Sequence, residues 1–579
     1  MNLDGFFFTA LIKELETELT GSRVEEVYTD SDNKLYLQLR APGRTQKLMI
    51  SVISPPFTFF LAETVGSKNR TGFTQVLRNA LAGKFLTKIT NSAFDRWASF
   101  YFADTPDASP AYTLELELMG RQNDLTLTDN TKIIATSRIG DSEQRTLQPG
   151  HRFTPPPTSN KLKPQDLSAD YLEQLLAQRP AEKIAQSLVR LVFGVSVVLA
   201  TEICHRAKID PRQPANIDDI PHLIQVINVL TMNCLENNVR PVAYFNGNEL
   251  HSIYWTELTH LHELREERLA SLSQALALQF SAWRNQQLIK DKQNIAKHIH
   301  ARLKRTEKKL GKQLKELETA KNHQQFREIG DTLLAGLYQI GKGQSTVELI
   351  NPHNAKSMEI RLNPELSASE NAQSYYRKAR KYKDAAKIVQ QQINKSRQLI
   401  NYLESLHYSL EQCKNSAELE EIITEMREQG LFKKRQKKSA KGEAKLRSEF
   451  IRQQTPLGEN VLIGKNNRQN DLLTLHVANK NHIWLHVRDY PGSHVILETP
   501  DPDQNSLEYA ASLAAWHSKA RGAAKVEVVY TSVRNVKKIP GGKPGMVNYY
   551  NYRSLVIDPR AHMQTTPATA GGTPREDRQ

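Results

Sequence analysis

RQLINYLESLHYSLEQC, residues 397–413, repeats its apolar side chains at steps of four, three, four and three residues. These positions are Leu399, Leu403, Leu406, Leu410 and Cys413. Such spacing is the heptad pattern with which one helix packs along another. The intervening residues are mostly polar, so the stretch predicts a long helix that buries one narrow stripe against a partner helix.

The partner helix is expected upstream in the chain. Leu303, Leu310 and Leu317 recur every seven residues, and Leu314 is expected to fill in the same seam. At 1.5 Å per residue, a helix of about 60 residues would extend on the order of 90 Å. The two helices together predict an antiparallel coiled-coil arm within residues 257–440.

A small module is expected near the end of this arm, at about residues 345–365. TVELINP (346–352) and KSMEIRLNP (356–364) have the alternation of short strands and predict a hairpin. Pro352 and Pro364 are incompatible with one continuous helix through this region.

The chain before the arm divides into two parts. Residues 1–170 predict a mixed α/β domain, with helices at Phe7 to Leu19 and at Thr74 to Ala82. Half-buried strands are expected where apolar and polar residues alternate, at 34–40, 46–52, 85–94, 99–104, 112–119 and 124–129.

Residues 171–256 predict short helices only. Within them, Gly194 in a tight turn and Ser196 as the N-cap of the next helix are typical of a helix-hairpin-helix module. Such a module either offers backbone N–H groups to a phosphate or serves as plain helical packing, and the sequence does not choose between the two.

Strands return after the arm, in residues 441–563, around a helix at 507–520. They are expected at 460–466, 472–479, 482–490, 494–499 and 525–533. The polar tail 564–579 predicts disorder. The predicted fold class is therefore α+β and multidomain.

Composition points to a polyanionic partner. The chain has 579 residues, enough for about three to five domains. It carries 78 Lys and Arg against 63 Asp and Glu, a net charge of +15, and its pI is near 9.4. Hydrophobic residues make up 39% and the mean hydropathy is −0.55. A net positive charge of this size favours a polyanionic partner, nucleic acid first. With no run of 18 apolar residues, we expect a soluble protein with no membrane association.

The site of action is expected to be the cytoplasm. The first residues lack the basic region and the small-residue cleavage site of a secretory signal. The three cysteines, Cys204, Cys234 and Cys413, are far apart, which argues against disulfides and a zinc site and suits a reducing compartment.

Positive charge is concentrated in two segments. Residues 288–321 contain eleven Lys or Arg against four acids, and residues 432–447 contain eight against one. A solvated helix surface is a fair interpretation of the first segment, but so unbalanced a block as the second favours contact with phosphate. A long arm beside small basic modules suits a large folded RNA recognised by shape, rather than DNA.

Patterns for catalysis are missing from the sequence. It contains no phosphate-binding loop, no GxSxG and no HExxH. We therefore expect no catalytic residue, no metal and no cofactor.

Several stretches resemble one known family. These are MNLDGFFFTALIKEL at the start, SAFDRWASF and ELELMGR in the first domain, ENAQSYYRKARKYK in the arm, and IGKNNRQNDLLTLHVANKNHIWLHVRDYPGSHVIL with KIPGGKPGMVNY near the end. Together they resemble the NFACT proteins, specifically the bacterial RqcH group, which is related to eukaryotic NEMF. The resemblance covers nearly the whole chain: NFACT-N (1–170), helix-hairpin-helix (171–256), coiled coil (257–440) and NFACT-R (441–563).

The resemblance implies a role in ribosome-associated quality control. Such proteins bind the large (50S) ribosomal subunit that still carries peptidyl-tRNA after a stall. They recruit alanyl-tRNA and promote addition of a C-terminal alanine tail without mRNA, which marks the chain for degradation. The ribosome makes the peptide bonds, so this protein is expected not to be an enzyme. A small S4-domain RNA-binding protein is a further partner that the resemblance suggests.

The resemblance also implies tRNA-binding residues in the first domain. They are Asp4, Asp95, Arg96, Met119, Gly120 and Arg121. Arg96 offers a planar fork to phosphate or a base edge. Without the resemblance, a local ion pair between Asp95 and Arg96 at a strand end would be the preferred interpretation. The chain departs from the family pattern at Gln122-Asn123-Asp124, where His-Ser-Asn is usual, which adds the negative charge of Asp124.

In the last domain, two turn-forming sets and a pair of lysines are expected to contact RNA. The candidate residues are Lys465, Asn466, Asn467, His486, Ser493, His494, Lys537 and Lys538. Trp484 shares a strand face with His486 and fits base stacking and a core position equally well.

Two other functions are alternatives. Members of the family have been described as fibronectin- or fibrinogen-binding adhesins, a role that conflicts with the absence of a secretion signal. The order of the first two domains also resembles formamidopyrimidine-DNA glycosylases. Those enzymes use an N-terminal proline and a zinc finger, whereas this chain has Asn2 and no cysteine pairs.

Overall fold

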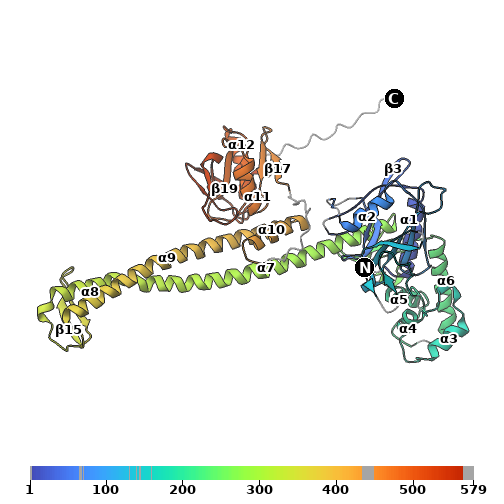
Figure 1. Cartoon of the computed structure of the whole chain (residues 1–579), viewed down its shortest axis with the longest axis horizontal. Helices are drawn as coiled ribbons and strands as arrows, with labels where there is room; N and C mark the ends of the chain where they lie inside the picture. Colours follow the sequence, from blue (N-terminus) through green and yellow to red (C-terminus); the bar gives the residue numbers. More distant parts are fainter. Residues whose placement is uncertain are drawn as a thin grey trace. The chain divides into compact units, whose positions relative to one another are not determined.

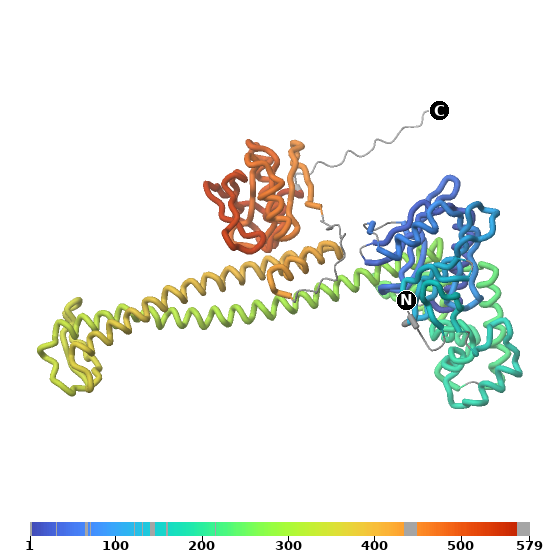
Figure 2. Tube along the Cα trace, in the orientation of Figure 1, coloured from blue at the N-terminus to red at the C-terminus, as the bar shows by residue number. Residues whose placement is uncertain are grey.

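The computed structural model describes residues 3–30, 32–63, 68–69, 71–129, 131–138, 140–141, 145–157, 160–214, 216–432 and 449–564. The predicted basic segment 432–447 and the tail 564–579 lie almost entirely outside these residues. The chain divides chiefly into two compact units, one up to Gln287 and one from Leu288 onwards (Figures 1 and 2). Each unit is described by itself.

The first unit is built on a nine-stranded antiparallel sheet in the order β4-β3-β2-β1-β5-β6-β7-β8-β9. Its strands are β1 (Arg23–Thr29), β2 (Leu35–Ala41), β3 (Arg44–Ser51), β4 (Thr58–Leu61), β5 (Phe85–Asn91), β6 (Trp97–Ala103), β7 (Tyr112–Glu117), β8 (Asp124–Asp129) and β9 (Lys132–Thr136). Every strand predicted from alternation in this region is present. A short pair, β10 (Gly140–Asp141) and β11 (Thr146–Leu147), follows, and helix α2 is Gly72–Leu81.

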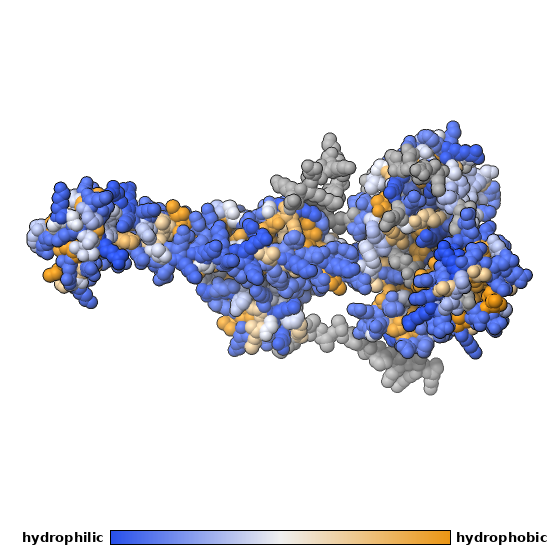
Figure 3. Space-filling view, turned by 90° about the horizontal axis from the view of Figure 1, so that it is seen from below, coloured by the Kyte–Doolittle hydropathy of each residue, from blue (hydrophilic) through white to orange (hydrophobic). Residues whose placement is uncertain are grey.

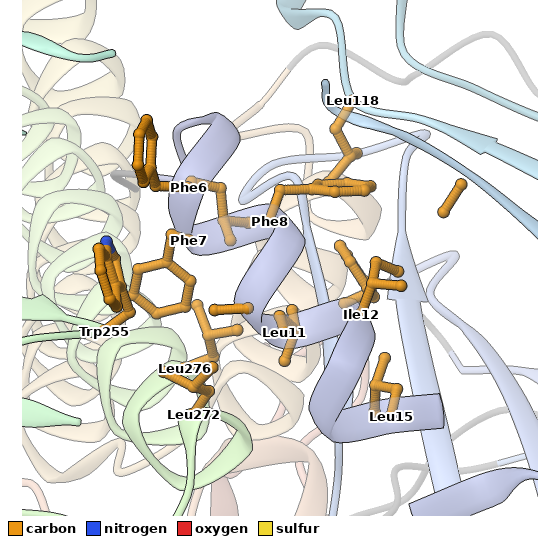
Figure 4. Close-up of a cluster of buried hydrophobic side chains, with 14 of the residues drawn as sticks. Phe6, Phe7, Phe8, Leu11, Ile12, Leu15, Leu118, Trp255, Leu272 and Leu276 are labelled. Atoms are coloured by element: carbon orange, nitrogen blue, oxygen red, sulfur yellow. The ribbon is translucent and has the colours of Figure 1, made fainter. Parts of the chain in front are cut away.

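Helix α1 (Gly5–Leu19) is the centre of the core of this unit. Its run of apolar residues is buried on all sides instead of along one stripe. In Figure 4, Phe6 and Phe7 point toward Trp255, while Phe8 lies on the side of Leu118. A helix that is apolar all round is stable only between two packed layers. Each such side chain contributes about 1.5–3 kcal/mol when fully buried.

The segment predicted as short helices alone contains strands as well. Helices α3 (Ala169–Ala177), α4 (Ile184–Leu191), α5 (Val197–Arg206) and α6 (Ile220–Leu235) are followed by a three-stranded sheet. Its strands are β12 (Val242–Asn246), β13 (Glu249–Tyr254) and β14 (Arg265–Arg268), in the order β13-β12-β14. The prediction of helices up to residue 256 was therefore wrong after α6. Alternation in β13 is weak, because it buries only its last two residues, Ile253 and Tyr254.

Three backbone segments meet closely beside the start of α1. Gly194, in the turn between α4 and α5, has φ +77°, and a Cβ there would lie 2.7 Å from Phe94. A Cβ on Gly5 would lie 1.9 Å from the Phe94 carbonyl oxygen. The Gly5 N–H donates to the Gly194 carbonyl at 3.0 Å. Only glycines allow this approach, so the helical turn and the sheet are locked to the first turn of α1.

The second unit contains the long helical arm. It is formed by most of α7 (Leu272–Ala320), which starts in the first unit, by α8 (His323–Ala335) and by α9 (Ala368–Gln412), followed by α10 (Ser416–Glu428). The predicted hairpin is present as β15 (Thr346–Ile350) and β16 (Ser357–Arg361). At 49 residues, α7 is shorter than the predicted helix of about 60 and rises about 74 Å. Most of the surface visible in Figure 3 is hydrophilic.

The seam of α7 includes polar residues that the leucine repeat did not reveal. Ile299, Thr306, Gln313 and Ala320 are buried at steps of seven, whereas Leu314 is 41% exposed and lies outside the seam. The Gln313 side chain donates to Gln392 at 3.1 Å and accepts from Ser396 at 2.8 Å, both on α9. A hydrogen-bonded polar layer of this kind fixes the register of two helices that leucines alone would leave free to slide.

The last domain has a six-stranded sheet in the order β17-β18-β20-β19-β21-β24. Its elements are β17 (Ile451–Gln454), β18 (Asn460–Ile463), α11 (Asn467–Leu472), β19 (Ile483–Val487), β20 (Val495–Leu497), α12 (Gln504–Trp516), β21 (Val526–Ser532), β24 (Arg553–Ile557) and α13 (Ala561–Gln564), with a separate pair β22 (Val536–Lys538) and β23 (Val547–Tyr549). Helix α12 packs its alanine-rich face on the sheet.

One strand predicted for this domain is helical instead. Residues 473–477 continue α11 as a single π-helical turn. The side chain of Asn466 accepts from the Gln469 N–H at 2.9 Å and starts the helix, so a capping residue outweighs five residues of alternation.

We predict that Gly194→Ala destabilises the first unit more than Gly43→Ala does. Both glycines have φ +77°, but a Cβ on Gly43 meets nothing within 4 Å. Both variants lose about 1 kcal/mol or more from the strained backbone, and only the first adds a clash, of about 1–3 kcal/mol. Urea unfolding of the two variants measures the difference. Equal losses would show that the close approach at Phe94 is unimportant.

Candidate nucleic-acid interface

A cavity of about 480 Å³ opens where α1, the β5–β6 turn and the α4–α5 turn meet. Four of the residues singled out from the sequence, Asp4, Asp95, Arg96 and Met119, line it. The remaining lining residues are Leu3, Gly5, Phe94, Pro157, Lys161, Phe193, Gly194, Val195 and Ser196. The helical hairpin therefore contributes a wall of the same cavity that the first domain begins.

Asp4 is a structural member of the cavity wall. It caps α1, accepting from the Phe7 N–H at 2.9 Å, and it is 7% exposed. Its other oxygen accepts from the hydroxyls of Ser196 at 2.5 Å and Tyr254 at 2.6 Å. Burial raises the pKa of Asp4, while these hydrogen bonds lower it. Both oxygens are thus engaged inside the protein, and Asp4 positions the cavity.

Asp95 and Arg96 do not form an ion pair with each other within the described residues. Asp95 instead accepts from the backbone N–H of Arg96 at 2.7 Å. Burial raises the pKa of Asp95, and the backbone hydrogen bond and the charge of Arg96 partly oppose this. The half-buried Arg96 guanidinium makes no hydrogen bond or ion pair to the part of the chain that the structure describes. Its fork of donors is available to a ligand in the cavity.

A second cation, Lys161, lies in the same cavity. Its ammonium group donates to the Val189 carbonyl at 2.7 Å. Burial and then the charge of Arg96 lower the pKa of Lys161. Two cations that repel each other in a partly desolvated space favour an anion between them. Sequence reasoning missed Lys161 because it lies outside every helix and strand predicted for residues 1–170.

The loop after β7 places its residues differently. Gly120 is exposed with φ +76° and open space around it, so a ligand can approach the Gly120 backbone closely. The side chain of Arg121 lies outside the described residues. Asp124 is 2% exposed and accepts from the hydroxyls of Thr126, Thr136 and Ser137 and from the Arg138 N–H. Its negative charge is thus internal and not presented to a ligand.

In the last domain, the predicted contact residues before α11 face the arm. Lys465 pairs with Glu418 at 3.0 Å. The Asn466 side chain donates to Glu421 at 2.7 Å, and that of Asn467 donates to Glu425 at 3.0 Å. These three carboxylates lie on one face of α10. The structure therefore engages Lys465, Asn466 and Asn467 within the protein.

The second predicted set in this domain is buried. Ser493 and His494 are 7% and 1% exposed, and His494 shares a hydrogen bond of 2.7 Å with Thr474. Trp484 is a core residue at 0% exposure, with His486 stacked on it at 5.8 Å between ring centroids. Burial lowers the pKa of His486 to about 4, so its ring is neutral near pH 7.

Lys537 and Lys538 are exposed, as a contact with RNA requires. Lys538 pairs with Asp471, and Lys537 forms no ion pair within the described residues. Among those residues, no cluster of three or more potential ligands is arranged to hold a metal ion, and no helix combines the length and hydrophobicity needed to cross a bilayer. The three cysteines are buried and free.

Comparison with known proteins identifies relatives over almost the whole chain. Residues 4–445 match the family model for NFACT N-terminal and middle domains, and residues 449–551 match the NFACT protein RNA binding domain. The protein described as "Rqc2 homolog RqcH" from Bacillus subtilis is 30% identical over 97% of this chain and 98% of its own length. That of Streptococcus suis is 29% identical over 96% and 98%.

A solved structure, the C-terminal part of the fibronectin/fibrinogen-binding protein from Streptococcus suis, is also similar. It is 30% identical with a TM-score of 0.38, covering 47% of this chain and 95% of its own. A likeness of this extent carries no argument about function.

The contact between arm and last domain predicts a pH dependence. Glu425 is fully buried, and burial raises its pKa to about 7 from an ordinary 4.5. Its stabilising contribution is therefore complete below pH 4.5 and is lost as pH rises through about 7. The loss amounts to about 3 kcal/mol.

We expect Glu425→Gln to unfold at a higher temperature than the wild type at pH 8 and to lose most of this advantage at pH 5. Thermal unfolding of the full chain at both values measures it. Glu420→Gln, on the same helix with its side chain 60% exposed, is the control. A constant difference between wild type and Glu425→Gln across this range would contradict the assignment.

Proposed function

The chain belongs to the NFACT family, and from this premise we propose that it is a ribosome-associated quality control factor that binds tRNA through the cavity around Arg96. The full-length relatives named RqcH and the matched RNA-binding domain support a quality-control role. The finer proposal is that it binds the large (50S) subunit carrying peptidyl-tRNA and recruits alanyl-tRNA. It thereby promotes mRNA-independent alanine tailing of the stalled chain.

The observation that carries the tRNA proposal is the guanidinium of Arg96, which has no partner among the described residues, beside Lys161 in one cavity. RNA offers two complementary groups for such a site. A phosphate lies between two cations, and an unpaired base offers an edge to the guanidinium and a face to apolar walls such as Met119 and Phe193. A tRNA without a codon needs its loop held in this way.

The protein acts in this proposal as an adaptor and not as an enzyme. Arg96 and Lys161 bind, Asp95 fixes the backbone at Arg96, and Asp4 holds the helical turn in place. The peptide bond is left to the ribosome. The proposed partners are the 50S subunit, tRNA and a small S4-domain protein, and the proposed compartment is the cytoplasm.

We predict that Arg96→Ala reduces tRNA co-purification at least about tenfold and abolishes alanine tailing, because it removes the free donor fork of the cavity. Asp95→Ala is expected to have a smaller effect, through looser positioning of Arg96. Sequencing of co-purified RNA and a tailing assay on stalled chains measure the two outcomes.

Arg78→Ala is the matched control. Arg78 is another partly buried arginine of the first unit, with its side chain 26% exposed, and it already pairs with Glu26. It should leave both tRNA and tailing at wild-type levels. If Arg96→Ala folds normally and retains tailing, the cavity is not the tRNA site.

A further inference from the structure

Three segments of the last domain share an unusual composition. They are NKNH (479–482), VRNVKK (533–538) and NYYNYR (548–553). Together they contain five Lys or Arg, five Asn and three Tyr, and no Asp or Glu. A domain surface normally intersperses both signs of charge, so segments this free of acids point to an anionic ligand if they lie together.

The backbone brings the three segments together. The Arg534 N–H donates to the Lys480 carbonyl at 2.9 Å, which joins the first segment to the second. The Tyr550 N–H donates to the Asn535 carbonyl at 3.1 Å, which joins the second to the third. In the β22–β23 pair, Lys537 lies opposite Asn548. We call the surface made by Lys480, Arg534, Lys537, Tyr550 and Tyr552 the basic–tyrosine surface.

The cations of this surface are not neutralised by any residue that the structure describes. Lys480, Arg534 and Lys537 are exposed and form no ion pair within the described residues. Arg534 is oriented by a hydrogen bond of 2.6 Å to the neutral amide of Asn481, which leaves its charge intact. Three fixed positive charges without counter-charges repel one another, and a polyanion relieves this repulsion.

The tyrosines of the surface are exposed, and Tyr552 is also held in place by its neighbours. Tyr550 is 51% and Tyr552 43% exposed. Tyr552 packs edge-on against Tyr549 at 5.0 Å, and Tyr549 in turn packs on the buried Trp484 at 5.4 Å. An aromatic ring that is exposed but anchored offers a face to a stacking partner at little entropic cost.

We propose that the basic–tyrosine surface binds unpaired nucleotides of RNA, with bases stacked on Tyr550 and Tyr552 and phosphates bound by Lys480, Arg534 and Lys537. The lysines and the arginine bind phosphate groups, the tyrosines stack on base faces, and the neighbouring asparagines hydrogen-bond to base edges. Duplex RNA would satisfy only the cations, since its bases are already stacked. This inference rests on the proposed RNA-directed function, and it places a second contact at a site separate from the Arg96 cavity.

The basic–tyrosine surface differs from the turn before α11, which also was predicted to contact RNA. Lys465, Asn466 and Asn467 are engaged by carboxylates of α10, so the turn predicted to bind RNA is not open. Among the described residues no carboxylate pairs with Lys480, Arg534 or Lys537, so the basic–tyrosine surface retains both the cations and the aromatic rings that RNA recognition needs.

The test uses the full chain and two labelled RNAs of equal length, one single-stranded with mixed sequence and one duplex. We expect K480Q/R534Q/K537Q to bind the single strand at least about tenfold more weakly and to reduce the slope of log affinity against log salt by about 2. Tyr550→Ala with Tyr552→Ala should weaken the single strand about tenfold and the duplex hardly at all.

Two matched variants serve as controls. Lys525→Gln removes an exposed lysine of the same domain that forms no ion pair with the described residues, and Tyr490→Ala removes a tyrosine that is 52% exposed. Neither should change affinity more than about twofold. Ultraviolet crosslinking followed by mass spectrometry should map the single strand to the peptide that contains Tyr550.

The proposal is overturned if the surface variants bind the single strand like the wild type, or if crosslinks fall elsewhere. It is also overturned if the Lys and Arg variant loses affinity for heparin as strongly as for RNA while the tyrosine variants keep both affinities. The surface would then bind any polyanion. Arg96→Ala should leave the crosslink to the peptide that contains Tyr550 in place. If Arg96→Ala loses tailing and the surface variants bind the single strand normally, this inference alone is wrong. If Arg96→Ala keeps tailing and the surface variants bind the single strand weakly, the proposed tRNA site alone is wrong.

Discussion

The carboxylate of Asp4 connects three parts of the first unit. It caps the helix at the centre of the core and binds the hydroxyls of Ser196 and Tyr254 from two later segments. A buried carboxylate is unfavourable unless donors surround it, and here three donors do so. Because the cavity lies at this junction, its shape depends on a residue whose two carboxylate oxygens already accept three hydrogen bonds within the protein.

The arm also places hydrogen-bonded polar side chains within packing that is otherwise apolar. Gln313 bonds to two residues of α9 within a leucine seam, and Glu425 lies fully buried between α9, α10 and the last domain. Burying such groups is costly, but the hydrogen bonds that Gln313 and Glu425 Oε1 accept or donate form in only one register or one docked position. Leucines supply the attraction between the parts, and the buried amides and carboxylates select the geometry.

Periodicity in the sequence predicted most of the strands of the first sheet, both arm helices and the hairpin between them. The prediction failed where the repeat of apolar residues does not coincide with the positions that are buried. Leu314 fits the apolar pattern but faces solvent, while Thr306 and Gln313 occupy the seam. Residues 472–479 alternate like a strand, yet 472–477 continue the helix that the N-cap at Asn466 begins. At the candidate site, resemblance gave Asp95 and Arg96, but Lys161 could not be found, since only the fold brings residue 161 beside residue 96.

Exposure also separates the two candidate sets of the last domain in a way that the sequence alone could not. Glycine, asparagine and lysine before α11 form a turn typical of phosphate contact, but the arm supplies the carboxylates that occupy it. Lys480, Arg534 and Tyr550 belong to no common motif, because three segments contribute them. What makes them a candidate site is that Lys480, Arg534 and Lys537 form no ion pair within the described residues once the backbone has joined these segments. A binding surface for RNA is thus defined less by the presence of cations than by cations that the protein leaves without a partner.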